Sequence, residues 1–318
     1  MTESIGVWSA GSIGCIIFLN WYYKIQATQA ILVNNVFKLK YQLPTTMIRS
    51  LLTFFTILMV TGLVWLGNIA PAAAQEQPTD ITASQQELAE LVQKAFEATN
   101  EGKFPAAETL WTQIIEKFPS QAAAWSNRGN SRVSQNKLQP AIADYEKAIE
   151  LAPEAPDPYL NRGTALEGLG RWEEAIADYN HVLELDPKDP AAYNNRGNAE
   201  AGLGEWEPAI SDYNKAFELA PEYAFARANH ALALYQNGQT EEAIRNMKNI
   251  VRRYPQFADM RAALSACLWE AGNRGEAESN WVAAVGLDSR YKDLDWVAKN
   301  RRWPPVVVSA LDKFLNLK

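Results

Sequence analysis

The asparagines of this chain are the residues whose type and spacing most plainly suggest a chemical role. Four of them recur at one constant interval along the chain, at Asn127, Asn161, Asn195 and Asn229. Three more stand within about one helical turn of these positions, at Asn130, Asn194 and Asn198. A carboxamide both donates and accepts hydrogen bonds, so a row of carboxamides can hold the backbone of an extended polypeptide whatever its side chains are. The spacing therefore favours peptide binding.

Patterns that would indicate catalysis or metal binding are missing from the sequence. His181 and His230 have no cysteine or acidic partner at the spacing that a zinc site needs. No nucleophile elbow and no glycine-rich phosphate loop is present. Cys267 falls in an apolar stretch, and the only other cysteine is in the N-terminal part, so we expect a buried, unreactive thiol. We predict that the protein is not an enzyme and holds no cofactor or metal.

The charge of the chain argues against nucleic acid as a partner. The formal net charge is -7, and residues 1–74 hold four basic residues and one acidic residue, so residues 75–318 carry -10. An acidic surface repels phosphate backbones, and no basic stripe interleaved with aromatic residues occurs. We expect protein or peptide clients instead.

A regular period organises residues 88–291 into six units of equal length, namely 88–121, 122–155, 156–189, 190–223, 224–257 and 258–291. Proline keeps one position of the period at Pro119, Pro153, Pro187, Pro221 and Pro255. Alanine keeps another at Ala107, Ala141, Ala175, Ala209, Ala243 and Ala277. A third is held by Gly102, Asn136, Gly170, Gly204, Gly238 and Gly272, and asparagine shares some of the tolerance of glycine for left-handed backbone.

The fourth unit shows why each of these positions is occupied as it is. We expect a first helix over 190–203, which Gly204 ends in a left-handed cap, and a second helix over 206–219, which Pro221 ends. Ala209 is small enough to stand where the two helices cross. One helix pair cannot bury both of its faces, so stacking of successive pairs has to supply the core.

This period and its content resemble the tetratricopeptide repeat (TPR) family, whose units are about 34 residues long. The resemblance implies an all-α, right-handed superhelical solenoid of about six helix-turn-helix repeats, with a concave groove lined by the first helix of each unit. In that family the sixth position of the first helix faces the groove, and here it holds the four asparagines that recur once per unit. The row is similar to the asparagine ladder of the repeat domain in O-linked N-acetylglucosamine transferase. The alternative is that these amides bond neighbouring carbonyls or water.

Two further features bear on the groove. Family members that capture a C-terminal carboxylate carry a basic residue four positions before the asparagine; this chain has none there, so such capture is disfavoured and an uncharged groove is expected. Three arginines, each followed by glycine, could form an anion site: Arg128, Arg162 and Arg196. We favour the other interpretation, in which the stem of each arginine packs and its head reaches a neighbouring carboxylate.

Residues 292–318 follow the last unit. A short helix is expected around 295–301, and Pro304 and Pro305 interrupt it. A final helix would place Val307, Leu311, Phe314 and Leu315 on one face and cover the last repeat as a capping helix. This tail resembles the ends of plant chloroplast lumen TPR proteins and their cyanobacterial relatives.

Residues 47–74 have the three parts of a signal peptide: a basic residue, an apolar run over 51–66 and small residues before Gln75. Residues 1–46 precede it. Either Met47 is the true start, or residues 5–23 form a weak first membrane span and the link between the two spans stays in the cytoplasm. Both interpretations export residues 75–318, of which 75–87 would be a polar linker.

These observations predict an exported TPR scaffold or assembly factor that binds client polypeptides in its groove, in the thylakoid lumen or the periplasm. The alternative is an accessory subunit whose uncleaved leader tethers it to a membrane and whose acidic outer face docks one membrane complex. We expect contact with the membrane only through the leader, if the leader is uncleaved.

Overall fold

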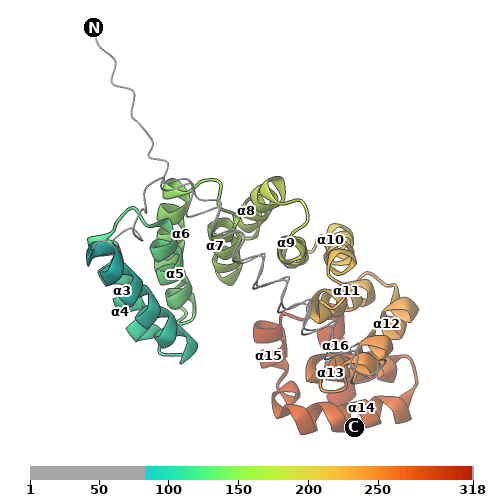
Figure 1. The fold of residues 1–318 in the computed structure, drawn as a ribbon. Coiled ribbons are helices and arrows are strands. Elements are labelled where there is room, and N and C mark those ends of the chain that lie inside the picture. The colour runs from blue at the N-terminus through green and yellow to red at the C-terminus, as the bar shows by residue number, and fades with distance from the viewer. Residues whose placement is uncertain (1–82, 317–318) are drawn as a thin grey trace, which may run out of the picture. The chain divides into compact units, whose positions relative to one another are not determined.

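The computed structural model describes residues 83–316, and the predicted leader and upstream segment lie outside them. The described part contains fourteen α-helices and no strand (Figure 1). Twelve helices form six consecutive pairs: α3 (Ala83–Asn100) and α4 (Phe104–Lys117), α5 (Ala122–Val133) and α6 (Leu138–Leu151), α7 (Pro156–Gly168) and α8 (Trp172–Leu185), α9 (Pro190–Leu203) and α10 (Trp206–Leu219), α11 (Ala224–Gln236) and α12 (Thr240–Arg253), α13 (Ala258–Glu270) and α14 (Arg274–Leu287).

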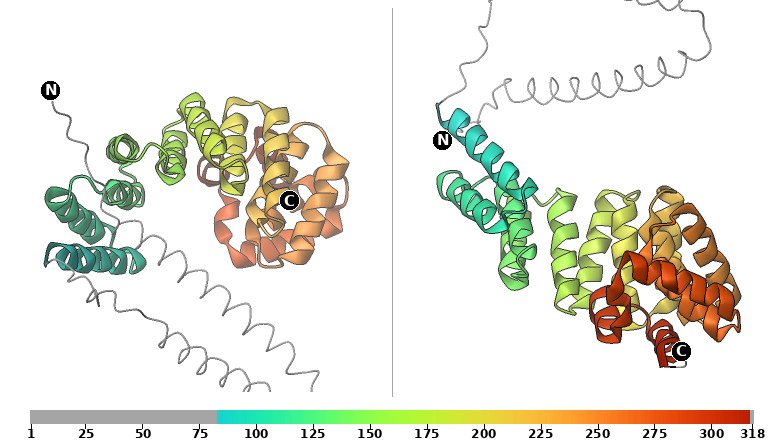
Figure 2. Two further views of the ribbon diagram at one scale, coloured as in Figure 1. Left: turned by 45° about the horizontal axis from the view of Figure 1, so that its top comes forward. Right: turned by 90° about the horizontal axis from the view of Figure 1, so that it is seen from below.

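Each of these helices packs against the next one along the chain, and the first helices of units two to five also touch one another in sequence (Figure 2). The prediction of an all-α solenoid of helix pairs is therefore confirmed. The fourth unit has the expected bounds, because its helices run from Pro190 to Leu203 and from Trp206 to Leu219.

The turn between the two helices of each unit is left-handed at one residue. These residues have φ between 58° and 81°, and they are Gly102, Asn136, Gly170, Gly204, Gly238 and Gly272. The Cβ atom of an ordinary residue comes too close to a backbone carbonyl oxygen in this conformation, which is why five of the six are glycine; the sixth is asparagine, which tolerates it better than most residues do. The expectation drawn from the third series of the period is confirmed.

Small residues stand where the paired helices cross. The six alanines of the period, from Ala107 to Ala277, are all fully buried. On the first helix of units two to four, a glycine faces a tyrosine ring of the second helix. A Cβ built at Gly163 would lie 2.6 Å from Cε1 of Tyr179, closer than packed atoms approach. The absence of a side chain there is what allows the ring to fit.

The C-terminal segment folds back onto the last units. A 3-10 turn (Ser289–Lys292) leads into α15 (Leu294–Trp296), a π-helical turn (Val297–Arg301) and α16 (Pro305–Asn316). α16 buries Val307, Leu311 and Phe314 and packs against α13 and α11, as expected of a capping helix. The helix expected over 295–301 is thus short and widens into a π turn before the chain reverses at Arg302.

α3 begins at Ala83, five residues before the first unit was expected to start, so the polar linker predicted over 75–87 overlaps this helix. Alanine, glutamine and glutamate are good helix formers, which explains why the polar residues 83–87 extend the helix. Within residues 83–316, no helix combines the length and the apolar character that crossing a membrane requires.

Candidate functional site

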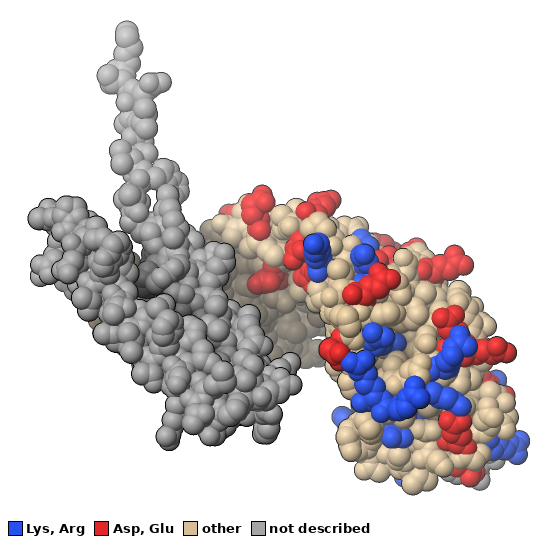
Figure 3. Space-filling model, turned by 45° about the vertical axis from the view of Figure 1, so that its right-hand side comes forward, with Lys and Arg blue, Asp and Glu red and all other residues tan. Residues whose placement is uncertain are grey.

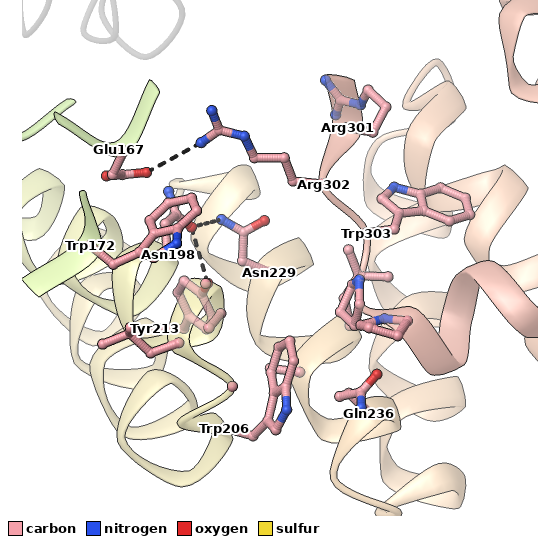
Figure 4. A pocket seen from close by; sticks show the side chains of 18 of the residues that line it. Glu167, Trp172, Asn198, Trp206, Tyr213, Asn229, Gln236, Arg301, Arg302 and Trp303 are labelled. Carbon is pink, nitrogen blue, oxygen red and sulfur yellow. Dashed lines mark hydrogen bonds and ion pairs between the residues drawn. The ribbon is translucent and has the colours of Figure 1, made fainter. Parts of the chain in front are cut away.

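A cavity of about 730 Å³ opens between the first helices of units three to five and the C-terminal segment (Figure 4). Its lining combines amides, aromatic rings and charged groups from widely separated parts of the chain. The side chains labelled in Figure 4 are Glu167, Trp172, Asn198, Trp206, Tyr213, Asn229, Gln236, Arg301, Arg302 and Trp303.

Four of the seven predicted asparagines form one hydrogen-bond network across α9 and α11. Asn229 Nδ2 donates to Oδ1 of Asn194 and to Oδ1 of Asn198, at 3.1 Å in each case. Tyr213 Oη also donates to Asn198 Oδ1, at 3.0 Å, and Asn194 Nδ2 donates to Asn195 Oδ1. Of these amides, Asn198 and Asn229 line the cavity, and Asn194 is buried behind them.

The other predicted asparagines lie outside the lining of this cavity. Asn127 Nδ2 donates to the carbonyl oxygen of Ala123, and Asn130 Oδ1 accepts from Tyr145 Oη. Asn161 is half-buried on α7. Four of the predicted amides are thus joined to one another at units four and five, whereas the three on α5 and α7 stand apart from this network.

The C-terminal segment is fixed beside the cavity by one buried carboxylate. Asp259 Oδ1 accepts hydrogen bonds from Tyr291 Oη, Arg301 Nε and Trp303 Nε1 at 2.8, 2.7 and 3.0 Å. The backbone N–H of Val306 donates to Gln236 Oε1 at 2.8 Å. Residues 301–306 are thereby tied to both α11 and α13.

Arg302 extends from this segment across the cavity toward unit three. Its Nη1 lies 3.7 Å from Oε2 of Glu167, and its guanidinium stands 5.5 Å from the ring centre of Trp172 (Figure 4). Its backbone is left-handed, with φ 52° and ψ 40°, a conformation that costs a non-glycine residue on the order of 1–2 kcal/mol. The anchored neighbours Arg301 and Trp303 hold it there.

Glu167 is the partner of Arg302 and lies almost fully buried on α7. Burial raises the pKa of its carboxyl to about 7, although the hydrogen bond from Tyr179 and the charge of Arg302 both act to lower it. Near neutral pH this group is poised between its neutral and charged forms. The cavity therefore contains a titratable carboxyl as well as a cation.

The expectation of an uncharged groove is wrong, since Glu167, Arg301 and Arg302 all line it. Sequence analysis missed the two arginines because they come from the tail, far from the repeats that they face. The sequence did contain a signal for the aromatic part of the cavity. Trp172 and Trp206 occupy equivalent positions of successive units, and both line the cavity.

The three arginines followed by glycine are structural. Each pairs with the aspartate sixteen residues later, at 2.7 Å for Arg128 with Asp144 and 2.6 Å for Arg162 with Asp178. Arg196 pairs with Asp212 in the same way, at 2.6 Å. The favoured interpretation is confirmed, and we call these three ion pairs the Arg–Asp ladder.

Cys267 is buried, as expected, and burial raises the pKa of its thiol. Within residues 83–316, no cluster of His, Cys, Asp and Glu side chains is arranged to hold a metal ion. The chemistry of the cavity described above is that of recognition through amides, rings and charges.

Comparisons with known proteins agree with the helix pairs. A family described as "TPR repeat" matches residues 129–170 and 168–204, and families described as "Tetratricopeptide repeat" match residues 190–223 and 229–289. This chain carries tetratricopeptide repeats. A comparison with curated proteins finds no match.

Solved structures share the TPR fold. A tetratricopeptide repeat protein from Parabacteroides merdae is 22% identical, with a TM-score of 0.57, over 73% of this chain and 93% of that one. A chain of the APC/C hetero-tetramer Cut9–Hcn1 is 16% identical, with a TM-score of 0.59, over 71% of this chain and 42% of that one. At these identities the likeness concerns the arrangement of the helices.

Proposed function

We propose that this protein is an exported TPR scaffold or assembly factor that binds client polypeptides in the cavity between α7, α9, α11 and residues 301–305. The observation that carries the proposal is the meeting of amides, aromatic rings and a bridging arginine in one cavity of a repeat fold. The compartment that we propose is the thylakoid lumen or the periplasm.

The amides of α11 are suited to a polypeptide backbone. Asn229 uses its nitrogen within the network, and its Oδ1 accepts no hydrogen bond from a described residue. Gln236 has its nitrogen free instead of its oxygen. Its Oε1 accepts a hydrogen bond from the backbone N–H of Val306, while its Nε2 donates to no described residue. The two stand about two helical turns apart on the same helix and offer an acceptor and a donor, which an extended backbone can match.

The rings add affinity that does not depend on client sequence. Trp172 and Trp206 present large, rigid surfaces at equivalent positions of successive units. Aromatic residues of this kind are enriched at interfaces because they bury much area while losing little conformational entropy. Clients would thus be held through their backbone and through apolar contacts.

The proposed location rests on the sequence of residues 47–74, which has the parts of an export signal. Protease treatment of isolated thylakoids and of spheroplasts tests it. We expect residues 75–318 either to be protected in thylakoids until the membrane is opened or to be digested in intact spheroplasts. A full-length chain retained in the membrane would favour the tethered accessory subunit instead. A chain that is digested outside intact thylakoids and protected in intact spheroplasts would contradict export.

Capture experiments with matched variants test the binding site. Polypeptides bound by the wild-type protein from the native membrane fraction are identified, and the affinity of each is measured for Asn229→Ala and Asn127→Ala. Removing one hydrogen bond should weaken binding by about 2-fold to 12-fold for Asn229→Ala. Asn127→Ala, outside the cavity, should bind as the wild type does. Equal affinities for both variants, at unchanged melting temperature, would contradict the proposal.

A further inference from the structure

A second cavity, of about 520 Å³, lies between α10, α11 and α12. None of its lining residues lines the first cavity. Its polar lining is made of basic and amide side chains, chiefly Asn214, Arg227, His230, Asn246, Asn249 and Arg252. Glu242 is the one acidic residue among them.

The position of this cavity is explained by an interruption of the Arg–Asp ladder. The period places His230 where unit four has Arg196, and Asn246 where unit four has Asp212. In unit four, Arg196 also donates through Nη1 to Oδ1 of Asn180, at 2.7 Å, and the equivalent of Asn180 is Asn214. His230, Asn246 and Asn214 all line the second cavity. The second cavity therefore occupies in unit five the position that the Arg–Asp ion pair occupies in unit four. Histidine and asparagine replace the arginine and the aspartate there.

Two of the basic residues around this space, Arg227 and Arg252, lack acidic partners. Arg227 donates through Nε to the carbonyl oxygen of Pro221 and stands 4.7 Å from the ring centre of Phe217. Arg252 donates through Nη2 to Oδ1 of Asn249 at 2.6 Å. Neither makes an ion pair with a described carboxylate, whereas Arg253 at the rim pairs with Glu222. Two guanidinium groups thus face the space without a neutralising partner.

The charge of unit five differs from that of its neighbours. Residues 156–223 hold five basic and fourteen acidic residues and carry a net charge of -9, whereas residues 224–257 hold five basic and two acidic residues and carry +3. On the face drawn in Figure 3, lysine and arginine side chains gather over the lower part of the described surface. An acidic ligand would be drawn to unit five and repelled from units three and four.

We propose that the second cavity is a binding site for a carboxylate side chain, a glutamate or aspartate in an acidic segment of a polypeptide. Arg227 and Arg252 supply charged donors, and the amides of Asn214, Asn246 and Asn249 supply neutral ones. With Arg253 neutralised by Glu222 and with Glu242 present, the lining has one excess positive charge. That excess balances a monoanion, and Glu242 disfavours the dianionic form of phosphate.

The first test is a titration of the full chain with an acetylated and amidated glutamate-rich peptide, its glutamine counterpart and inorganic phosphate. We expect the glutamate peptide to bind at least about tenfold more tightly than the glutamine peptide, and its affinity to fall as salt is added. Equal affinity of the two peptides would overturn the proposal. Phosphate that displaces the glutamate peptide with comparable affinity would overturn the assignment to a carboxylate.

Variants of α12 locate the binding. Arg252→Gln should weaken the glutamate peptide about tenfold, because a charged donor in the cavity is lost. Arg245→Gln is the matched control: it removes an exposed arginine of the same helix that does not line the cavity. An equal loss in both variants would show attraction to the surface as a whole and would overturn the site.

Restoring the ladder gives an independent test. In the double variant His230→Arg with Asn246→Asp, the arginine and aspartate of unit four are placed in unit five, where they should pair and fill the space. Binding of the glutamate peptide should be lost while the fold is kept. Full affinity in a folded double variant would overturn the proposal, and if the double variant does not fold, the comparison of Arg252→Gln with Arg245→Gln decides. The residues changed in the α12 variants and in the double variant do not line the first cavity.

Discussion

In units two to four, an arginine of the first helix pairs with an aspartate of the second, and a glycine beside that arginine accepts a tyrosine ring. In units five and six neither pair occurs. The arginine position holds His230 and then Leu264, and the tyrosine position holds Met247 and then Trp281. The same crossing of two helices is thus stabilised by a polar ladder in one region and by apolar packing in the other.

The difference has a physical consequence for where binding sites form. The apolar cluster of units five and six extends without a break into the tail, through Leu264, Trp281, Val297 and Phe314. Because the tail is held by this cluster, it can carry Arg302 over the first cavity. The second cavity lies where the ladder stops. Both cavities lie where units of the two kinds meet, because the first is lined mainly by units three to five and the tail and the second by units four and five.

The largest effect should come from the apolar end. Phe314 is fully buried, with its ring 5.2 Å from the rings of Trp269 and Trp281. Phe314→Ala should lower the free energy of unfolding by about 3–5 kcal/mol. Denaturant melts measure this, and Phe225→Ala, which removes an exposed ring, should cost about 1 kcal/mol or less. Equal losses would mean that α16 does not cap the stack.

A pH-dependent effect of about 3 kcal/mol is expected from Glu167 in the ladder region. The folded state holds its pKa near 7, above the ordinary value of 4.5, so the folded state binds the proton more tightly than the unfolded state. The stability contribution of Glu167 should therefore fall as pH rises from about 4.5 to 7 and then level off. Plots of the free energy of unfolding against pH for the wild type and for Glu167→Gln should differ most in slope between about pH 4.5 and 7. Parallel curves would contradict the raised pKa.

Breaking one rung of the ladder should have a smaller effect. Asp178→Asn leaves the guanidinium of Arg162 half-buried beside a neutral amide, which should cost about 1–3 kcal/mol in denaturant melts. The matched change in unit five, Asn246→Ala, removes no ion pair and should cost less. If the two changes cost the same, the ladder does not distinguish the two regions.

The smallest effect should come from the glycine positions. Gly163→Ala places a methyl against the ring edge of Tyr179 and should cost about 1–2 kcal/mol, as overpacking does when a ring can shift. The equivalent residue of unit five is already alanine, Ala231, and the equivalent of Tyr179 there is Met247. Ala231→Gly should be destabilising too, by about 1 kcal/mol, through the poor helix propensity of glycine. A stabilising Gly163→Ala would show that the ring has room.

Features within a repeat were predictable from the sequence, whereas features between distant parts were not. The left-handed turn at Gly204 and the buried crossing at Ala209 follow from residues only a few positions apart, and the period repeats the information six times. The contact of Arg302 with Glu167 joins residues that no period relates. Nor does a repeat consensus reveal that Asn194 bonds its neighbour Asn195 and the amide of the next unit. Those partners depend on how the units stack.

The bridge from Arg302 to Glu167 has a further consequence for how the array opens. In a repeat array each unit contacts only its neighbours, so each unit is stabilised by the units on either side of it. The two ends of the array can therefore unfold locally and independently of each other. Here the tail reaches back past units four and five to unit three. Fraying of the last unit and its tail therefore also breaks a contact of unit three. Hydrogen exchange should show that opening of α16 is accompanied by faster exchange at the C-terminal end of α7, where Glu167 lies.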